Sequence, residues 1–268
     1  MRLTWLGWAG VELEHEGSTV VIDPLAEPGA VFAPLGGAAA GAPQPDVASA
    51  SPGRAVAGLV THLHRDHADA GALAAALAPG AAVLEPPAAG GDDLENLGLA
   101  QAEHELAAAG LPRRRLEPWE TVQAGPFAVA ALPAVDGLGD PQVGWAVAAG
   151  GVRVAHFGDT VFHGFWWRIA RRHGPFDVVL LPVNGAVVGF PHRRPASPLP
   201  AALTPEQAAI AAGLLGARLA VPIHAEGYEA AGVYEPVPDA AARFVAEAGR
   251  RGVPARLLAV GEAITARA

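Results

Sequence analysis

Apolar residues along the chain fall into short runs, most of which end at a glycine, a proline or a charged residue. Runs of this length between turn signals are typical of buried strands, and longer segments rich in Ala and Leu favour helices. The predicted strands cover residues 3–13, 19–22, 56–60, 81–84, 120–132, 144–149, 152–157, 177–181, 217–221 and 255–260. The predicted helices cover residues 68–77, 100–109, 165–173, 204–215 and 239–251.

Several local signals predict how these elements begin, end and pair. Pro79-Gly80 is expected to stop the helix over residues 68–77, because Pro and Gly both disfavour a continued helix. Gly150-Gly151 is expected to form the turn of a hairpin. Thr204 is expected to cap a helix, with Pro205 as its first residue.

Two long segments lack such a pattern and are rich in Pro, Gly and Ala. They cover residues 27–54 and 184–203, and the second contains the run Pro191-His192-Arg193-Arg194-Pro195. Loops of this length are often functional lids or disordered segments. Both are predicted to be surface loops.

A histidine or aspartate follows many of the predicted strands. These residues are Asp23, the group from His62 to His67, Asp136, Asp159 and His224. Ligands at several strand ends can converge on one rim of a sheet, where active sites usually lie. Asp23 could instead cap a turn, and a role in orienting a neighbouring ligand is equally compatible with its place.

The densest group is Thr61-His62-Leu63-His64-Arg65-Asp66-His67, between a predicted strand and a predicted helix. Residues i and i+2 of an extended segment point the same way, so His62 and His64 can bind one cation together. Asp66 and His67 lie past the bend and suit a second cation. Imidazole and carboxylate ligands suit Zn, Fe, Mn or Ni. A polar loop with scattered histidines is the alternative interpretation.

Composition narrows the possible functions. A chain of 268 residues with 51% apolar residues can form one large domain, and we expect a single domain over residues 1–268. It has no Cys, so any metal must be held by His, Asp or Glu. The formal net charge of −9 argues against a nucleic-acid partner, because such proteins usually carry a basic stripe.

Location and assembly are predicted by default. The start of the chain has a strand pattern and not that of a signal peptide, and no apolar run is long enough to span a bilayer. We therefore expect a cytoplasmic protein that acts on a small molecule, without membrane contact and with possible homo-oligomers.

The chain resembles the metallo-β-lactamase superfamily of metal-dependent hydrolases, in particular its ascorbate-6-phosphate lactonase-like branch. The resemblance spans nearly the whole chain, and its strongest element is the H-x-H-x-D-H motif. Its landmarks are Leu3-Thr4-Trp5-Leu6-Gly7, Val21-Ile22-Asp23-Pro24, the segment from Thr61 to His67, Phe157-Gly158-Asp159-Thr160 and Val221-Pro222-Ile223-His224.

The resemblance implies a four-layer αββα sandwich of the α/β class, with two divalent metal ions, most often Zn, in a groove along the sheet edges. It implies that His62 and His64 bind the first ion and that Asp159 bridges both. The implied ligands of the second ion are Asp66, His67 and His224.

The chain departs from the family pattern at two positions. Where the family supplies a third His to the first ion, this chain has Asp136, whose carboxylate can also ligate zinc, iron or manganese. His163 or His156 could take that place instead. Trp8 stands where relatives often have His, which could alter the groove floor.

We expect metal-dependent hydrolysis in which a shared water, activated by the two ions, attacks a small and anionic ester, lactone or phosphodiester. Asp66 and Asp159 are the predicted catalytic residues, because they could orient the nucleophile or carry a proton. His163, His192 and Tyr228 are predicted to line the substrate pocket. His192, Arg193 and Arg194 could bind a phosphate or carboxylate, but a solvated Pro-rich loop without a specific role is the favoured interpretation of this segment.

Three other functions stay open at this stage. One is a degenerate member that binds metal or ligand without turnover, as Asp136 and Trp8 would suggest. A metal-dependent nuclease is the second. The third is an oxygen-reducing or oxidising iron enzyme on the same fold, although the chain has no obvious flavin domain.

Overall fold

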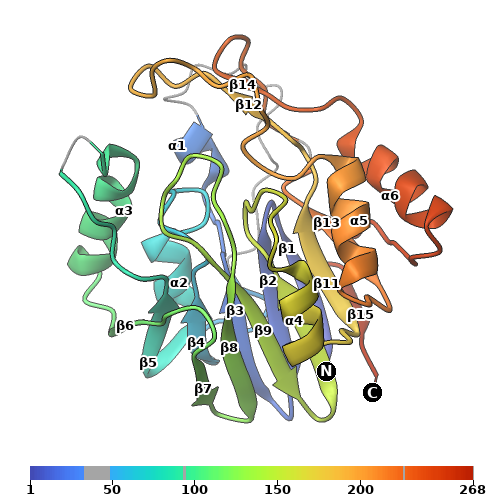
Figure 1. Cartoon of the computed structure of the whole chain (residues 1–268). Coiled ribbons are helices and arrows are strands. Elements are labelled where there is room, and N and C mark those ends of the chain that lie inside the picture. Colours follow the sequence, from blue (N-terminus) through green and yellow to red (C-terminus); the bar gives the residue numbers. More distant parts are fainter. Residues whose placement is uncertain (33–48, 93–94, 226, 268) are drawn as a thin grey trace.

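Two β-sheets, one formed mainly by the first half of the chain and one by the second half, lie face to face with helices outside them (Figure 1). The computed structural model describes residues 1–32, 49–92, 95–225 and 227–267. The first sheet has the order β15-β1-β2-β3-β4-β5-β6. Its strands are β1 (Arg2–Gly7), β2 (Gly10–His15), β3 (Ser18–Ile22), β4 (Ala55–Leu59), β5 (Leu77–Glu85), β6 (Arg113–Arg115) and β15 (Ala263–Thr265).

The second sheet has the order β13-β11-β10-β9-β8-β7. Its strands are β7 (Thr121–Ala124), β8 (Phe127–Pro133), β9 (Val143–Ala149), β10 (Val152–His156), β11 (Val178–Pro182) and β13 (Ala220–Ile223). β10, β11 and β13 are parallel, as are β3, β4 and β5 in the first sheet. Parallel neighbours end at the same edge of their sheet, which is the edge that carries the polar residues predicted from the sequence.

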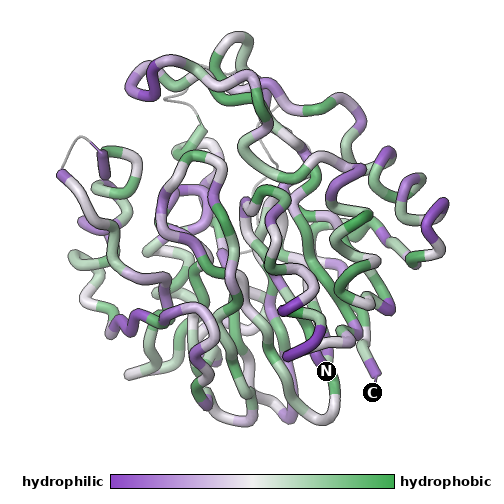
Figure 2. The backbone as a smooth tube through the Cα atoms, in the orientation of Figure 1, coloured by the Kyte–Doolittle hydropathy of each residue, from purple (hydrophilic) through white to green (hydrophobic). Residues whose placement is uncertain are grey.

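The central strands are buried on both faces, which explains why β3, β4 and β11 are nearly continuous apolar runs. Val20 and Ile22 of β3 point into the core between the sheets, whereas Val21 points to the outer core under the helices. β11 does the same in the second sheet, with Leu180 between the sheets and Leu181 under the helices. Apolar residues accordingly concentrate along the strands in Figure 2.

Helices cover the two outer faces. α2 (Ala70–Ala76) and α3 (Leu97–Ala108) lie beside the first sheet, and α4 (Trp166–His173), α5 (Pro205–Leu214) and α6 (Ala240–Arg250) beside the second (Figure 1). Thr204 caps α5 as predicted: its side chain accepts from the backbone N–H of Gln207, and Pro205 is the first helical residue. The four layers confirm the predicted αββα sandwich.

The predicted helices and most predicted strands are present within a few residues of their expected bounds. Pro79-Gly80 was wrong as a helix stop, because the helix ends at Ala76 and both residues lie inside β5. The loop predicted over residues 184–203 contains a short strand, β12 (Val187–Val188). Most of the loop predicted over residues 27–54 lies outside the described residues, and its start forms α1 (Pro28–Phe32).

The last predicted strand, residues 255–260, was also wrong. Only Ala255 pairs there, in a single bridge with Ala220 of β13. The chain then crosses to the other sheet, where Ala263–Thr265 pairs with β1. Apolar content gave this segment a strand pattern, but the chain leaves the edge of β13 after this bridge, and Leu257 and Val260 are 49% and 40% exposed.

A small sheet covers the rim where the site residues gather. It pairs β12 with β14 (Tyr234–Glu235) and lies across the ends of the main strands, near α1 (Figure 1). Among the described helices, none is both long and apolar enough to cross a bilayer.

Candidate metal centre

The seven predicted metal ligands meet at one rim, in two groups. Asp66, His67, Asp159 and His224 form the first group, and His62, His64 and Asp136 form the second. Within each group, the candidate ligand atoms lie within 4.8 Å of one another. The ligands follow β4, β8, β10 and β13, so strands from both sheets contribute.

Asp159 lies at the middle of the group that contains His67 and His224. Its Oδ1 atom is 3.3 Å from His67 Nε2 and 3.2 Å from His224 Nε2. Asp66 Oδ2 approaches the same two nitrogens, at 3.5 Å and 3.2 Å. Two imidazoles and two carboxylates that point at one small volume form a donor set suited to a divalent ion.

His62, His64 and Asp136 form the neighbouring group. The rings of His62 and His64 lie 4.4 Å apart, and those of His62 and His67 lie 4.2 Å apart, so the two groups are adjacent. One oxygen of Asp136 accepts the backbone N–H groups of Leu138 (2.8 Å) and Asp140 (3.0 Å). These two bonds hold the carboxylate in place and leave its other oxygen for an ion.

The alternatives to Asp136 lie elsewhere. His156 is fully buried, and its Nε2 is 2.8 Å from the backbone oxygen of Ala9. His163 stacks on Trp166 with ring centroids 4.1 Å apart. Burial lowers the pKa of His163 to about 4, so its ring is neutral at ordinary pH. Neither residue belongs to the two ligand groups found among the described residues.

Each group contains a histidine whose second ring nitrogen is held by a carboxylate. His67 Nδ1 is 2.8 Å from Asp23 Oδ2, and His64 Nε2 is 2.8 Å from Asp140 Oδ2. A carboxylate can only accept, so each of these nitrogens carries a proton. Although burial opposes it, the surrounding carboxylates raise the pKa of both rings, so a bound cation would displace the proton on the other nitrogen before that nitrogen could act as a ligand. Asp23 therefore orients the ring of His67, a candidate ligand, which favours the second of the two interpretations of this residue left open by the sequence.

His224 is held by a neutral partner. The side-chain amide of Asn184 lies 2.8 Å from His224 Nδ1 and 2.6 Å from the hydroxyl of Tyr234. An imidazole that binds metal through Nε2 carries its proton on Nδ1, which requires an acceptor there. In the structure the amide nitrogen of Asn184 faces both His224 Nδ1 and the Tyr234 hydroxyl and donates to them. The flipped amide would turn its oxygen to Nδ1 and would give up the 3.4 Å bond that Asn184 Oδ1 accepts from the N–H of Ala186.

Trp8 contacts the centre instead of ligating a metal. Its Nε1 donates to Asp66 Oδ2 at 2.9 Å, and its ring lies 3.9 Å from that of His224. Trp8, Asp23 and His224 all have positive φ, at 42°, 45° and 51°. Such backbone conformations cost about 1–3 kcal/mol each for residues other than glycine, and they concentrate at functional sites.

The electrostatics of the centre are those of a cation site. Burial strongly lowers the pKa of His62, and the neighbouring imidazoles lower it further, so His62 is held in the neutral form that binds metal. Burial raises the pKa of Asp136, and the nearby Asp159 and Asp140 add to that effect. Burial also acts on Asp159, but His224 and His67 outweigh it and lower the pKa of this carboxyl.

Three polar atoms in the centre lack a hydrogen-bond partner although they are buried. They are His62 Nε2, His67 Nε2 and Asp159 Oδ1. Buried polar atoms are usually paired, because leaving one unpaired costs about 1–3 kcal/mol. All three belong to the ligand groups, so bound cations would satisfy them together.

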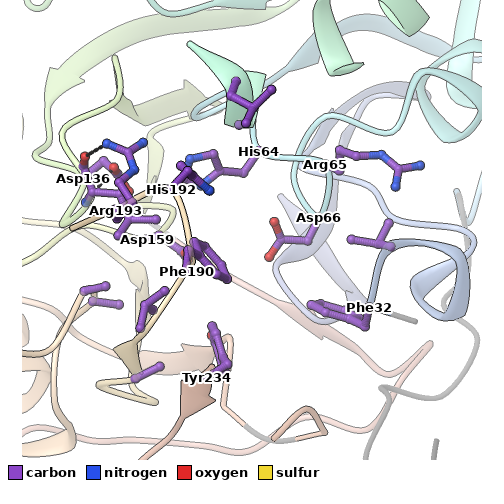
Figure 3. A pocket seen from close by; sticks show the side chains of 18 of the residues that line it. Phe32, His64, Arg65, Asp66, Asp136, Asp159, Phe190, His192, Arg193 and Tyr234 are labelled. Atoms are coloured by element: carbon purple, nitrogen blue, oxygen red, sulfur yellow. Dashed lines mark hydrogen bonds between the residues drawn. The ribbon is translucent and has the colours of Figure 1, made fainter. Parts of the chain in front are cut away.

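A cavity of about 350 Å³ opens onto the centre. Asp66, Asp136, Asp159 and His224 line it, and so does His192, as predicted. Figure 3 shows Asp66, Asp136, Asp159 and His192 around the open space. His163 and Tyr228, which were predicted to line it, do not. Tyr228 packs instead behind the wall, where its ring stacks on Phe32 at 4.7 Å.

Three residues of the centre were missed from the sequence. Asn184 closely follows the strand that ends at Pro182, so the strand-end rule could have found it. Asp140 and Tyr234 lie in segments with no comparable signal. Tyr234 lines the cavity, and burial strongly raises the pKa of its hydroxyl, as do the nearby Asp159 and Asp66, which keeps the phenol neutral.

Asp140 provides a test of how His64 is held. Because Asp140 Oδ2 is the partner of His64 Nε2, Asp140→Ala is expected to weaken metal binding by the His62 group about 10- to 100-fold. Competition with a chromophoric chelator measures this. Arg193→Ala is the matched control, since it removes the other partner of Asp140 and leaves the bond to His64. Equal losses in both variants would contradict this role of Asp140.

A model of the family described as the beta-lactamase superfamily domain matches residues 18–225, which include every predicted metal ligand. The chain belongs to the beta-lactamase superfamily. A curated member of Methanoregula boonei named UPF0173 metal-dependent hydrolase is 28% identical over 239 residues, which cover 85% of this chain and 84% of that protein.

Solved structures of the superfamily fold cover almost all of the chain. Igni18, a metallo hydrolase from Ignicoccus hospitalis, has a TM-score of 0.65 at 20% identity and covers 98% of this chain and 97% of its own. CmlA, a diiron beta-hydroxylase from Streptomyces venezuelae, has a TM-score of 0.73 at 18% identity and covers 98% of this chain and 53% of its own. Sequence identities this low show a similarity of fold and nothing about activity.

The comparisons confirm the predicted superfamily and fold, and the names of the relatives agree with the predicted class of metal-dependent hydrolase. The ascorbate-6-phosphate lactonase-like branch stays a prediction, as do the number and identity of the metal ions.

Proposed function

We propose that this member of the superfamily hydrolyses a small carboxylic ester or lactone with the help of two divalent metal ions. One observation carries the proposal: two adjacent groups of His and Asp, with unpaired buried atoms, lie at the base of a cavity. Asp23 and Asp140 support this arrangement, because they already orient the rings of His67 and His64, whose other nitrogens would bind the ions once deprotonated.

Each candidate ligand has a proposed role in the centre. His62, His64 and Asp136 would hold one ion, and Asp66, His67, Asp159 and His224 the other. When bound, such ions lower the pKa of a water molecule from about 15.7 towards ~7 and polarise the substrate oxygen. Asp66 and Asp159 reach the cavity and could orient the nucleophile or pass a proton to the leaving group.

The donor set also indicates which metal ions the centre would bind. Three carboxylates and four imidazoles, with no thiolate, suit zinc, and the carboxylates make manganese, iron and nickel acceptable as well. We propose zinc as the first metal to test. A diiron enzyme of the CmlA kind is a separate possibility, and colour together with iron content distinguishes it.

An anionic substrate was expected from the sequence because of the loop with His192, Arg193 and Arg194. Arg193 Nη2 is 2.7 Å from Asp140 Oδ2, so its charge is already matched. This pairing removes the main argument for an anion and favours an ester or lactone over a phosphodiester. It also weakens the nuclease alternative, which the net charge of −9 already disfavours.

The deciding experiment is metal quantitation followed by an activity panel. Two equivalents of metal per chain and metal-dependent turnover of esters or lactones, above that of phosphodiesters and thioesters, are the expected results. One equivalent or none, with no turnover, would favour the degenerate alternative, which binds without catalysis. Turnover that persists unchanged after thorough chelation would refute a metal-dependent mechanism.

Metal removal is also expected to lower thermal stability. A ligand that binds only the folded state stabilises it by about 4 kcal/mol at a thousand times its Kd. For a chain of this size that corresponds to a fall in Tm on the order of 10 °C when the metal is removed. Differential scanning fluorimetry with and without zinc measures it. An unchanged Tm at saturating zinc would contradict binding at the buried groups.

A further inference from the structure

We propose, on the basis of the hydrolase function above, that the acyl part of the substrate is an uncharged apolar chain or ring that packs in the cavity beside the metal centre. Two features of the cavity support this: its wall is mainly apolar, and the arginine side chains that line it are already paired. Phe190 and Phe32 are the residues that determine this substrate class.

The wall above the ligands is mainly apolar. Its largest members are Phe32 at the end of α1, Leu97 at the start of α3, Leu138, Val188 of β12 and Phe190. In Figure 3, Phe190 and Phe32 lie on different sides of the open space, with Tyr234 below them and His64 above. A volume of about 350 Å³ is at the lower end of small-molecule sites, so the ligand is small.

Phe32 is held rigidly next to a metal ligand. Its ring contacts Trp8 edge-on at 5.1 Å and stacks on Tyr228 at 4.7 Å, and its side chain is 4% exposed. Trp8 in turn donates to Asp66. The apolar wall therefore begins directly beside the reacting centre, where the first carbons of an acyl chain would lie.

The cationic side chains of the wall are already engaged. Arg193 pairs with Asp140, and its Nη1 donates to the backbone oxygen of Leu138. Arg65 lies 3.4 Å from Glu105, and its guanidinium points away from the open space in Figure 3. His192, the other basic side chain on the upper wall, stacks its ring on Phe190 at 5.8 Å. A charged tail would thus lose its water without gaining a counter-ion.

A matched pair of ligands tests this without relying on turnover. Hexanoate and adipate have the same chain length and the same carboxylate for the metal end, but adipate ends in a second carboxylate. Calorimetric titration of the zinc-loaded protein is expected to give a Kd at least about tenfold lower for hexanoate, because its terminal methyl group is buried and no charge is desolvated. Equal or tighter binding of adipate would overturn the inference.

Single-residue variants test whether the cavity wall causes the preference for hexanoate. Phe190→Ala is expected to reduce the preference for hexanoate about three- to fivefold, and Phe190→Leu to retain most of it, since Leu restores the apolar area. Phe165→Ala is the control, because Phe165 is 37% exposed and does not line this cavity. A preference unchanged in Phe190→Ala, with the protein folded by circular dichroism, would remove Phe190 from the site.

Turnover of the corresponding p-nitrophenyl esters separates this inference from the proposed function. Faster metal-dependent hydrolysis of the hexanoate ester than of the adipate half-ester supports both. Preferential binding of hexanoate without hydrolysis of either ester supports the apolar site and refutes the hydrolase. Hydrolysis of both esters without preference for the apolar one supports the hydrolase and refutes the apolar site.

Discussion

The variant with both His62→Ala and His64→Ala is expected to hydrolyse its substrate at least about a thousandfold more slowly than the parent protein. This factor corresponds to the several kcal/mol by which a metal ion stabilises a transition state. Both imidazoles belong to the group that includes Asp136. A single carboxylate cannot retain an ion there, so one metal equivalent should be lost. Elemental analysis and the ester assay, made on the same preparation, measure the two effects.

The control for this variant is His104→Ala. His104 is exposed on α3 and belongs to neither ligand group found among the described residues, so its replacement should leave metal content and turnover unchanged. Circular dichroism separates lost ligation from unfolding, because His62 is fully buried. Undiminished turnover in the folded double variant would refute the assignment of these ligands.

Asp23→Asn is expected to weaken metal binding by the His67 group about 10- to 100-fold while leaving the fold intact. Asp23 is fully buried and accepts three hydrogen bonds: from the N–H of Thr61 at 2.8 Å, from its hydroxyl at 2.6 Å and from His67 Nδ1 at 2.8 Å. Asn has nearly the same shape. If its amide oxygen accepts the Thr61 N–H, its NH₂ group faces His67 Nδ1.

That change reverses the tautomer of His67. An NH₂ donor requires Nδ1 to accept, so the ring proton moves to Nε2, the atom that faces Asp66 and Asp159 and must present its lone pair to a metal. Turnover at limiting zinc should fall in parallel and should recover in part at high zinc. Chelator competition measures affinity, and the ¹⁵N shifts of the His67 ring report the tautomer.

The matched control is Asp239→Asn, at the start of α6. Asp239 has no capping bond from its side chain and a φ of 53°, a conformation that Asn tolerates well. This variant removes the same charge and should leave zinc affinity unchanged. If Asp23→Asn also binds zinc normally, with the ring proton of His67 still on Nδ1, Asp23 does not set the tautomer.

The sequence was sufficient for the ligands because their signal is local. Four candidate ligands follow the carboxyl end of an apolar strand: His62, Asp136, Asp159 and His224. Parallel strands bring such ends to one edge, so knowing the strands is almost enough to bring the ligands together. The same local reasoning predicted the capped helix at Thr204 and the hairpin at Gly150-Gly151, because both depend on neighbouring residues alone.

Prediction from the local sequence pattern failed where the structure of a segment depends on a partner that is distant in the chain. Residues 255–260 look like a strand, but β13 offers them one bridge, and the chain pairs with β1 further on. His163 follows Asp159 closely enough to suggest a shared site, yet its ring packs on Trp166. Nothing within a few residues of either segment reveals which surface it will meet.

The amino-acid sequence by itself therefore determined most of the main strands, the candidate ligands at their ends and the superfamily, since these depend on periodicity and on residue type at strand ends. Tertiary structure alone decided which partners orient the ligands and what the cavity would accept. Asp140 meets His64, Asn184 meets His224 and Phe32 meets Trp8 across long stretches of chain. Such contacts arise from how loops pack over the sheet edge, and no repeat in the sequence encodes them.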